Sequence, residues 1–217
     1  MDKQEILSRI DSTELKPTAT EREILQLCED AKQYRFAAVC VHPRFVSLCA
    51  RELAGTSVKV ATVVGFPQGA NTSACKAFET AEAVKNGASE IDMVLAIGAV
   101  KQGDFDYVRR DIEAVVQAAG GACVKVILET CFLSEEEIER ACLCAAEAGA
   151  HFVKTSTGFG AGGAQLSDIA VMKRAVGGRC QIKASGGIRT LEACEAFLSA
   201  GADRIGTGSG AKIAREE

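Results

Sequence analysis

The chain has 217 residues, of which 47% are hydrophobic and 25% are charged, and its formal net charge is −4. We expect one globular domain over residues 1–217, because a chain of this size can bury a single large core. The small negative charge provides no basic field, so we expect no nucleic-acid or membrane partner. The N-terminus MDKQEILSRI lacks the apolar centre of a signal peptide, and we expect a cytoplasmic protein.

The cysteine pattern argues against both a disulfide scaffold and a zinc site. Ten cysteines occur, and most stand singly inside apolar segments, where a thiol behaves as a small hydrophobic group. We therefore expect them to be reduced. Cys142 and Cys144 form the only close pair in the sequence, and the chain has only two histidines. No segment has the ligand spacing of a zinc site, so we predict no metal.

Eight apolar segments, many of them β-branched, predict strands along the chain. A weak first segment lies around Ile10 in SRIDSTEL, and the others begin near Phe36, Val58, Glu90, Cys123, Phe152, Cys180 and Arg204. The last seven follow one another at intervals of about 22 to 33 residues, which fits one strand and one crossover helix per unit.

Helix start and stop signals lie between these segments. Thr20 with Glu23 and Ser134 with Glu137 have the spacing of capping boxes, and Thr190 is a candidate N-cap. The stretches NGASEIDMV, AGAHFVKTS and AGADRIGTG each place a glycine where a helix would end and a strand would begin. The alternation predicts a (β/α)8 TIM barrel. An open doubly wound sheet is the alternative, and the absence of GxGxxG after the early strands disfavours it.

Charged residues interrupt four consecutive predicted strands: Asp92, Lys125, Lys154 and Lys183. Barrel strands are buried on both faces, so an unpaired charge there is costly, and three lysines cannot each pair with a single aspartate. Any one lysine alone would often extend to solvent from a strand end. Coincidence on four adjacent strands is a weaker explanation. We therefore expect these side chains to meet at the mouth of the barrel, where active sites form.

These charges suggest Schiff-base chemistry. Crowded, partly desolvated lysines lower one another's pKa, and a neutral lysine attacks carbonyl carbons. We predict Lys154 as the nucleophile, Lys183 as the cation that lowers its pKa, and Asp92 as the group that accepts and returns protons. Lys125 and Glu129 share a strand face by their spacing. They either extend this network, with Lys125 contacting the substrate, or form a supporting ion pair.

Two glycine-rich segments predict a phosphate site. ASGGIRT follows the seventh predicted strand and GTGSGAK follows the eighth, the places where barrels often bind phosphate through backbone N–H groups. Alternatively, the glycines only make tight turns. Thr157 and Gly158, after Lys154, offer space and a hydroxyl for a polar substrate, and residues 158–163 resemble a flexible flap. The phosphate candidates are Gly186, Gly187, Gly206, Gly208 and Ser209.

Over nearly its whole length the sequence resembles the deoxyribose-phosphate aldolases of the short bacterial type. The segments that carry the resemblance are IDSTELKPTAT, VCVHPRFV, EIDMVLAIGA, VKVILET, FVKTSTGF, IKASGGIRT and DRIGTGSG. The resemblance implies that Lys154 forms the Schiff base while Lys183 and Asp92 handle protons. It also implies reversible cleavage of 2-deoxy-D-ribose 5-phosphate to D-glyceraldehyde 3-phosphate and acetaldehyde, in deoxyribonucleotide catabolism, without metal or organic cofactor. We also expect a homo-oligomer, a dimer or tetramer.

The chain departs from the family pattern at two positions. Ser12 stands where the family often has histidine, and Gly208 precedes Ser209 where the family commonly has two serines. The second change removes one hydroxyl near the predicted phosphate site.

Two other functions remain possible from the sequence. One is a catalytically silent barrel that binds a phosphosugar, and the other is an aldolase for a different small phosphorylated sugar. The presence of Asp92, Lys154 and Lys183 together favours an aldolase, because binding alone requires no pair of buried amines.

Overall fold

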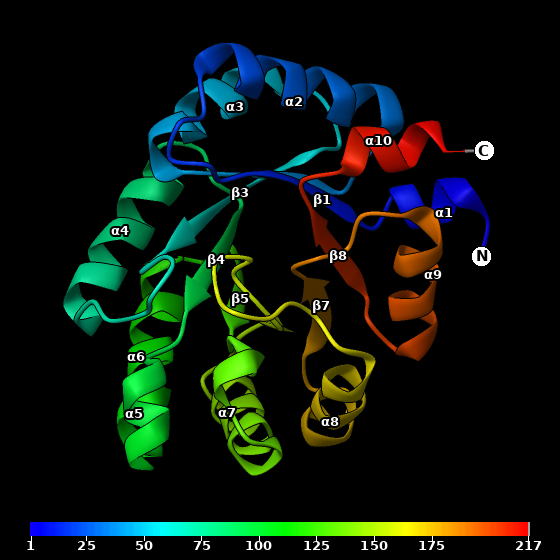
Figure 1. Cartoon of the computed structure of the whole chain (residues 1–217). Helices are drawn as coiled ribbons and strands as arrows, with labels where there is room; N and C mark the ends of the chain where they lie inside the picture. Colours follow the sequence, from blue (N-terminus) through cyan, green and yellow to red (C-terminus); the bar gives the residue numbers. More distant parts are fainter. Residues whose placement is uncertain (217) are drawn as a thin grey trace.

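The strands form a closed parallel barrel in sequence order (Figure 1). This computed structural model describes residues 1–216. Pairing of β1 with β8, which sets Asp11 opposite Gly206, closes the sheet. The predicted barrel is therefore confirmed, and the open sheet is excluded. The strands are β1 Ile10–Glu14, β2 Ala38–Val41, β3 Lys59–Val64, β4 Glu90–Val94, β5 Cys123–Ile127, β6 Phe152–Lys154, β7 Gln181–Ser185 and β8 Arg204–Thr207.

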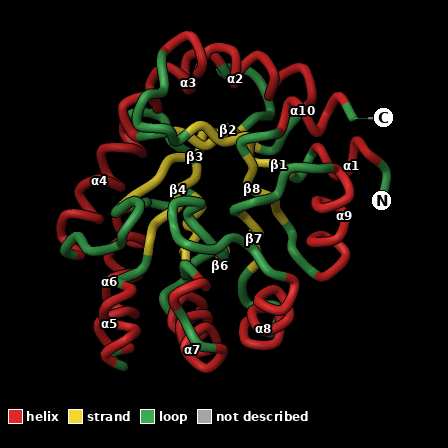
Figure 2. The backbone as a smooth tube through the Cα atoms, viewed as in Figure 1, coloured by secondary structure: helices red, strands yellow, loops and turns green. Residues whose placement is uncertain are grey.

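Helices surround the barrel, as Figure 2 shows in red around the yellow strands. Both predicted capping boxes are present, and Thr190 caps its helix by accepting a hydrogen bond from the N–H of Ala193. The helices are α1 Lys3–Leu7, α2 Glu21–Tyr34, α3 Val46–Glu52, α4 Ser73–Lys85, α5 Ile97–Gln102, α6 Phe105–Ala118, α7 Glu135–Glu147, α8 Leu166–Val176, α9 Leu191–Ala200 and α10 Gly210–Arg215, with short 3-10 helices at Pro43–Phe45 and Thr130–Phe132.

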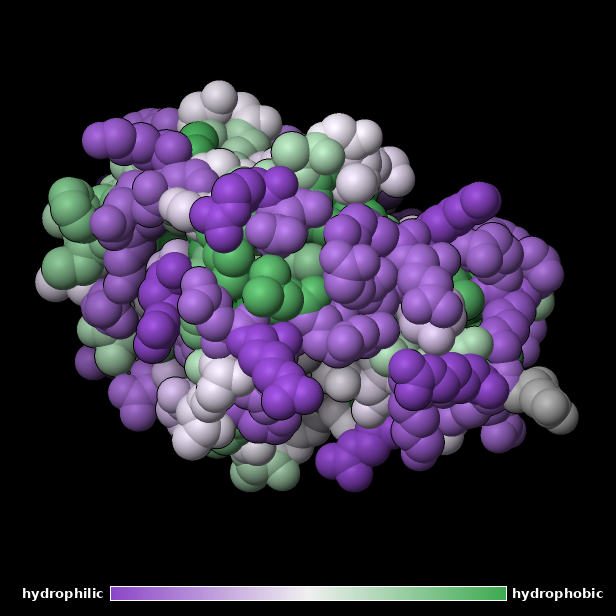
Figure 3. Space-filling view, turned by 90° about the horizontal axis from the view of Figure 1, so that it is seen from above, coloured by the Kyte–Doolittle hydropathy of each residue, from purple (hydrophilic) through white to green (hydrophobic). Residues whose placement is uncertain are grey.

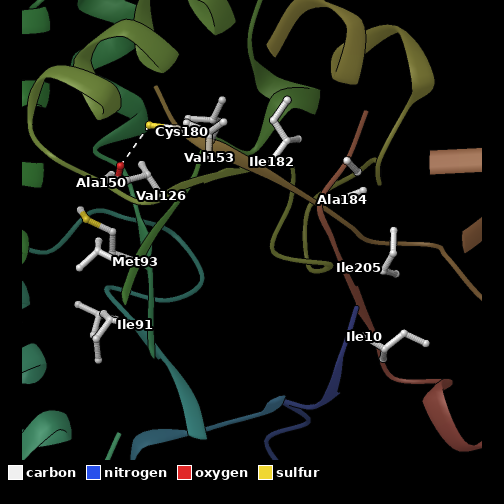
Figure 4. Packing of buried hydrophobic residues seen from close by; sticks show 14 of the residues in the cluster. Ile10, Ile91, Met93, Val126, Ala150, Val153, Cys180, Ile182, Ala184 and Ile205 are labelled. Carbon is white, nitrogen blue, oxygen red and sulfur yellow. Dashed lines mark hydrogen bonds between the residues drawn. The ribbon is translucent and has the colours of Figure 1, made fainter. Parts of the chain in front are cut away.

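The main hydrophobic core lies between the strands and the helices (Figure 4). Ile91 and Met93 on β4 belong to it, as does Cys180, whose thiol donates to the carbonyl of Ala150 over 3.1 Å. Because side chains alternate along a strand, Asp92 points the other way, into the barrel. The same alternation sends a second set of residues inward from every strand.

The barrel interior is divided between small apolar residues and charges. On the side of β1 to β3, a separate cluster contains Leu15, Ala38, Cys40, Ala61 and Val63, with Phe66 packed against it. Charged residues from β4 to β8 and from β1 occupy the rest of the interior. This division concentrates the charges on one side of the barrel.

On the face viewed in Figure 3, hydrophilic residues cover most of the surface, with small hydrophobic patches between them. Within residues 1–216, no helix combines the length and the apolar character needed to cross a membrane. All ten cysteines are free. The predicted domain ends at Glu217, which lies outside the described residues, and its boundaries remain a prediction.

Candidate active site

The four charges predicted to meet do meet, and Asp92 lies at their centre. Its Oδ1 accepts a hydrogen bond from Lys125, and its Oδ2 accepts from Lys154 and Lys183, each over 2.8 Å. Strand register explains the arrangement, since Asp92 is paired with Lys125 and Lys154 with Lys183. Lys154 exposes 3% of its surface and the other three expose none, so the lysines do not extend to solvent.

Two more carboxylates, missed by the sequence analysis, complete this cluster. Asp11 on β1 accepts from Lys183 through Oδ2 and from Arg204 through Oδ1, the latter over 2.7 Å. Glu90 on β4 forms a salt bridge of 2.5 Å with Lys125. Asp11 and Glu90, together with Asp92, therefore balance the three lysines. Glu90 precedes Asp92 by two residues, and residues two apart in a strand lie on the same face of the sheet. This spacing could have predicted that both carboxylates point into the barrel.

The two lysines nearest the mouth differ in pKa because they have different numbers of carboxylate partners. Burial lowers the pKa of Lys154 below its ordinary value, and repulsion from Lys183 lowers it further, against the opposing effect of Asp92. Burial also acts to lower the pKa of Lys183, but Asp11 and Asp92 together raise it above its ordinary value. Lys154 is thus the amine that loses its proton more easily, in the predicted direction, with burial as the larger cause.

Asp92 stays ionised despite its burial. Burial alone would raise the pKa of this carboxyl, but Lys125, Lys154 and Lys183 hold it well below its ordinary value. Lys125 has a pKa well above its ordinary value, because Asp92, Asp11 and Glu90 outweigh the effect of burial. An ionised carboxylate keeps accepting a hydrogen bond from a neighbouring amine when that amine changes its charge.

A cavity of about 410 Å³ opens above Lys154 at the carboxyl ends of the strands. Lys154 is the one member of the ion-pair cluster that lines it; Asp92 and Lys183 lie behind it. The other predicted residues that line the cavity are Thr157, Gly158, Gly186, Gly187, Gly206, Gly208 and Ser209.

Lys125 extends the polar network through Asp92, as one of the alternatives expected, whereas its contact with substrate and its ion pair with Glu129 are not found among the described residues. Lys125 is fully buried and does not line the cavity, so its predicted contact with substrate is not supported. It instead neutralises Asp92 and Glu90. Glu129 follows the end of β5 and does not pair with Lys125. Its carboxylate accepts from the backbone N–H of Thr157 over 3.1 Å and from the Thr157 hydroxyl.

The glycines of the β7 loop leave room for close backbone approach. Gly186 and Gly187 have φ values of 91° and 81°, which favour glycine, and a Cβ on Gly186 would lie 3.0 Å from the Cα of Gly163. On the next strand, a Cβ on Gly206 would lie 3.0 Å from Cε of Lys183. Gly206 therefore also leaves space for the lysine.

The loops after β7 and β8 present unequal sets of donors to the cavity. Among residues 1–216, the backbone N–H groups of Gly187 and Gly208 have no hydrogen-bond acceptor. The Ser209 N–H, in contrast, donates to Thr207 Oγ1 over 2.9 Å. The hydroxyl of Ser209 is therefore the group that this residue can offer to a ligand. Arg189 and Lys16, which the sequence analysis did not select, also line the cavity, as does Glu14, whose carboxylate forms a salt bridge of 3.0 Å with Lys16 and offsets its charge.

The chain matches the family model for DeoC/LacD aldolases over residues 1–216. It is 56% identical to the deoxyribose-phosphate aldolase of Geobacillus sp. strain WCH70 over 209 residues, 96% of this chain and 94% of the relative. A structure titled as a putative deoxyribose-phosphate aldolase from Coccidioides immitis superposes with a TM-score of 0.96 at 41% identity, covering 99% of this chain and 86% of that one. The tetrameric deoxyribose phosphate aldolase of Aeropyrum pernix gives a TM-score of 0.92 at 31% identity, covering 98% and 91%.

These matches extend over most of each protein compared, and the structural ones agree with the barrel fold. The chain belongs to the DeoC/LacD family of aldolases.

Proposed function

We propose that the protein catalyses the reversible cleavage of 2-deoxy-D-ribose 5-phosphate to D-glyceraldehyde 3-phosphate and acetaldehyde through a Schiff base on Lys154. The observation that carries the proposal is a buried lysine of lowered pKa on the wall of a polar cavity, hydrogen-bonded to Asp92 and beside Lys183. The similarity to the Geobacillus deoxyribose-phosphate aldolase supports this substrate.

In the proposed reaction, the neutral amine of Lys154 attacks the C1 carbonyl carbon of the open-chain sugar, and water leaves to form an iminium ion. The iminium withdraws the electron pair of the C2–C3 bond as that bond breaks, while the C3 hydroxyl gives its proton to Asp92 through an ordered water and becomes the aldehyde of glyceraldehyde 3-phosphate. The remaining enamine takes a proton at C2, and hydrolysis releases acetaldehyde and the free amine. The Lys154 iminium is the electron sink, so the reaction requires neither a metal ion nor an organic cofactor.

Lys183 and Asp92 have separate parts in this proposal. Lys183 keeps its proton, since its pKa is raised, and its positive charge favours the neutral form of Lys154. Asp92 accepts a hydrogen bond from both amines through the same oxygen, Oδ2, and in this proposal it takes up and returns a proton on the side of Lys154 rather than that of Lys183. Both groups lie behind Lys154, which supports proton transfer through the lysine or an ordered water.

The phosphate of the substrate would bind at the other side of the cavity, against the loops after β7 and β8. The free N–H groups of Gly187 and Gly208 and the hydroxyl of Ser209 supply donors there. Arg189 lies on the same cavity and favours an anion by its charge, whereas the charge of Lys16 is offset by its salt bridge with Glu14.

We also propose a homo-oligomer, dimer or tetramer, and a cytoplasmic location. The Aeropyrum pernix relative is described as tetrameric, which supports the first, and the ten free thiols support a reducing compartment. Light scattering of the purified protein would test the oligomeric state.

The test of the proposed activity is an assay of deoxyribose 5-phosphate cleavage, coupled to detection of glyceraldehyde 3-phosphate. We expect turnover in the wild type and loss of turnover in Lys154→Met. Binding of the substrate without cleavage by the wild type would contradict the proposal and favour a silent phosphosugar-binding barrel.

A further inference from the structure

Glu129 is a buried carboxylate beside the cavity, and the catalytic steps above do not use it. It exposes 2% of its surface and follows β5 with a φ of 56°, a backbone conformation that L side chains rarely adopt. Both of its oxygens bond to a single residue: Oε1 accepts from the Thr157 N–H over 3.1 Å, and Oε2 accepts from the Thr157 hydroxyl. This geometry joins the end of β5 to the loop that follows Lys154.

The contacts of the Thr157 hydroxyl determine what it offers to a ligand. A hydroxyl has one proton and two acceptor lone pairs. Thr157 donates its proton to Glu129, and its oxygen accepts from the Phe159 N–H over 3.0 Å. One lone pair remains, without a proton to donate. Because Thr157 lines the cavity together with Lys154, its hydroxyl faces a ligand only as an acceptor.

We infer that Glu129 is a positioning residue that fixes the Thr157 hydroxyl as a hydrogen-bond acceptor for a hydroxyl group of the substrate. The inference rests on the proposed function, in which the open-chain substrate has hydroxyls at and beside the carbon–carbon bond that breaks. A ligand with a carbonyl or phosphate oxygen at this place would meet a lone pair and bind poorly. Glu129 thereby selects which face of the cavity receives the hydroxylated part of the sugar.

Glu129→Gln tests this inference with little change in side-chain volume. The amide oxygen still accepts from the Thr157 N–H, but the amide NH₂ then donates to the Thr157 hydroxyl and occupies its last lone pair. The hydroxyl proton turns toward the cavity, so Thr157 becomes a donor. We expect kcat/KM for deoxyribose 5-phosphate to fall about tenfold or more, mainly because KM rises. This fold-change corresponds to the loss of one hydrogen bond. Thr157→Val should show a similar loss.

Two controls separate this effect from general damage. Thr130→Val removes the hydroxyl of a neighbouring buried threonine whose Oγ1 has no partner within the described residues, and its kinetics should match the wild type. Acetaldehyde has no hydroxyl group. Borohydride trapping of acetaldehyde on Lys154 should therefore proceed at the wild-type rate in both Glu129→Gln and Thr157→Val.

Each outcome decides the inference. Slower cleavage with normal acetaldehyde trapping supports it. Wild-type cleavage by Glu129→Gln overturns it, because the polarity of the hydroxyl would then be irrelevant. Equal losses of cleavage and trapping also overturn it, because Glu129 would then only maintain the structure. A wild-type protein that neither cleaves the sugar nor takes the label would instead overturn the proposed function, a result distinct from the other three.

Discussion

At the scale of single residues, Lys154 and Lys183 differ in the number of carboxylates they contact rather than in burial. Both are buried and register-paired on adjacent strands, but Lys183 contacts Asp11 and Asp92, while Lys154 contacts Asp92 alone. The additional carboxylate, Asp11, keeps Lys183 charged. Lys154, which lacks this second carboxylate, loses its proton more easily. Asp11 thus contributes to the difference without contacting the nucleophile.

Lys183→Leu should reduce turnover near pH 7 although the nucleophile remains. Removing the neighbouring ammonium raises the pKa of Lys154, and each unit of increase lowers the neutral fraction about tenfold at neutral pH. The rising limb of kcat/KM with pH should therefore move to higher pH, with partial recovery there, because burial still lowers the pKa. The measurement is a pH–rate profile from about pH 6 to 10.

Lys183→Arg is the matched control, because it keeps the positive charge and should leave the limb nearer its wild-type position. Thermal unfolding of both variants would check that they fold. If the rising limb of kcat/KM in Lys183→Leu stays at the wild-type pH or moves to lower pH, repulsion from Lys183 does not lower the pKa of Lys154.

At the scale of elements, the site depends on what each strand carries at its carboxyl end. Loops that contain glycines follow β6, β7 and β8, and residues of all three line the cavity. The sequence located these loops correctly from their glycines. It could not show that the Ser209 N–H is already bonded to Thr207, or that Gly206 makes room for Lys183, because both facts depend on side-chain packing between loops.

Ser209→Ala should raise KM for deoxyribose 5-phosphate by at most about one to two orders of magnitude and leave kcat nearly unchanged. The hydroxyl is the free donor at this position, and a hydrogen bond to a charged group contributes about 1.5 to 3 kcal/mol at most. Steady-state kinetics would measure the change. Unphosphorylated 2-deoxyribose is the control substrate, and its kinetics should be unaffected. Equal effects on both sugars would mean that Ser209 does not contact the phosphate.

At the scale of the whole molecule, the spacing of apolar segments was sufficient to predict eight strands and their closure into a barrel. Asp92, Lys125, Lys154 and Lys183 were visible as charges inside strands, and the structure brings them together. Asp11 was missed because its strand is only weakly apolar, so a charge there does not stand out as an interruption. The partner of Glu129 was missed because the chain turns after β5, where period-two spacing no longer applies.

The buried charges should make the stability of the protein depend on pH. Burial opposes ionisation of Asp11 and Asp92, yet their lysine and arginine neighbours lower both pKa values in the folded state. Their stabilising contribution is complete above the unfolded pKa of about 3.9 and is lost as pH falls toward the folded values. The free energy of unfolding, measured with urea at several pH values, should decrease steeply below about pH 4. An unfolding free energy that stays constant through this acid range would contradict the ion-pair account.

The central claim is that Lys154 is the amine that forms the Schiff base, and covalent trapping tests it most directly. The protein is incubated with acetaldehyde and sodium borohydride, digested, and analysed by mass spectrometry. We predict an ethyl adduct on Lys154, because its amine lines the cavity and has the lowered pKa. An adduct on Lys183 or Lys125 in place of Lys154, or no adduct at all, would contradict the claim.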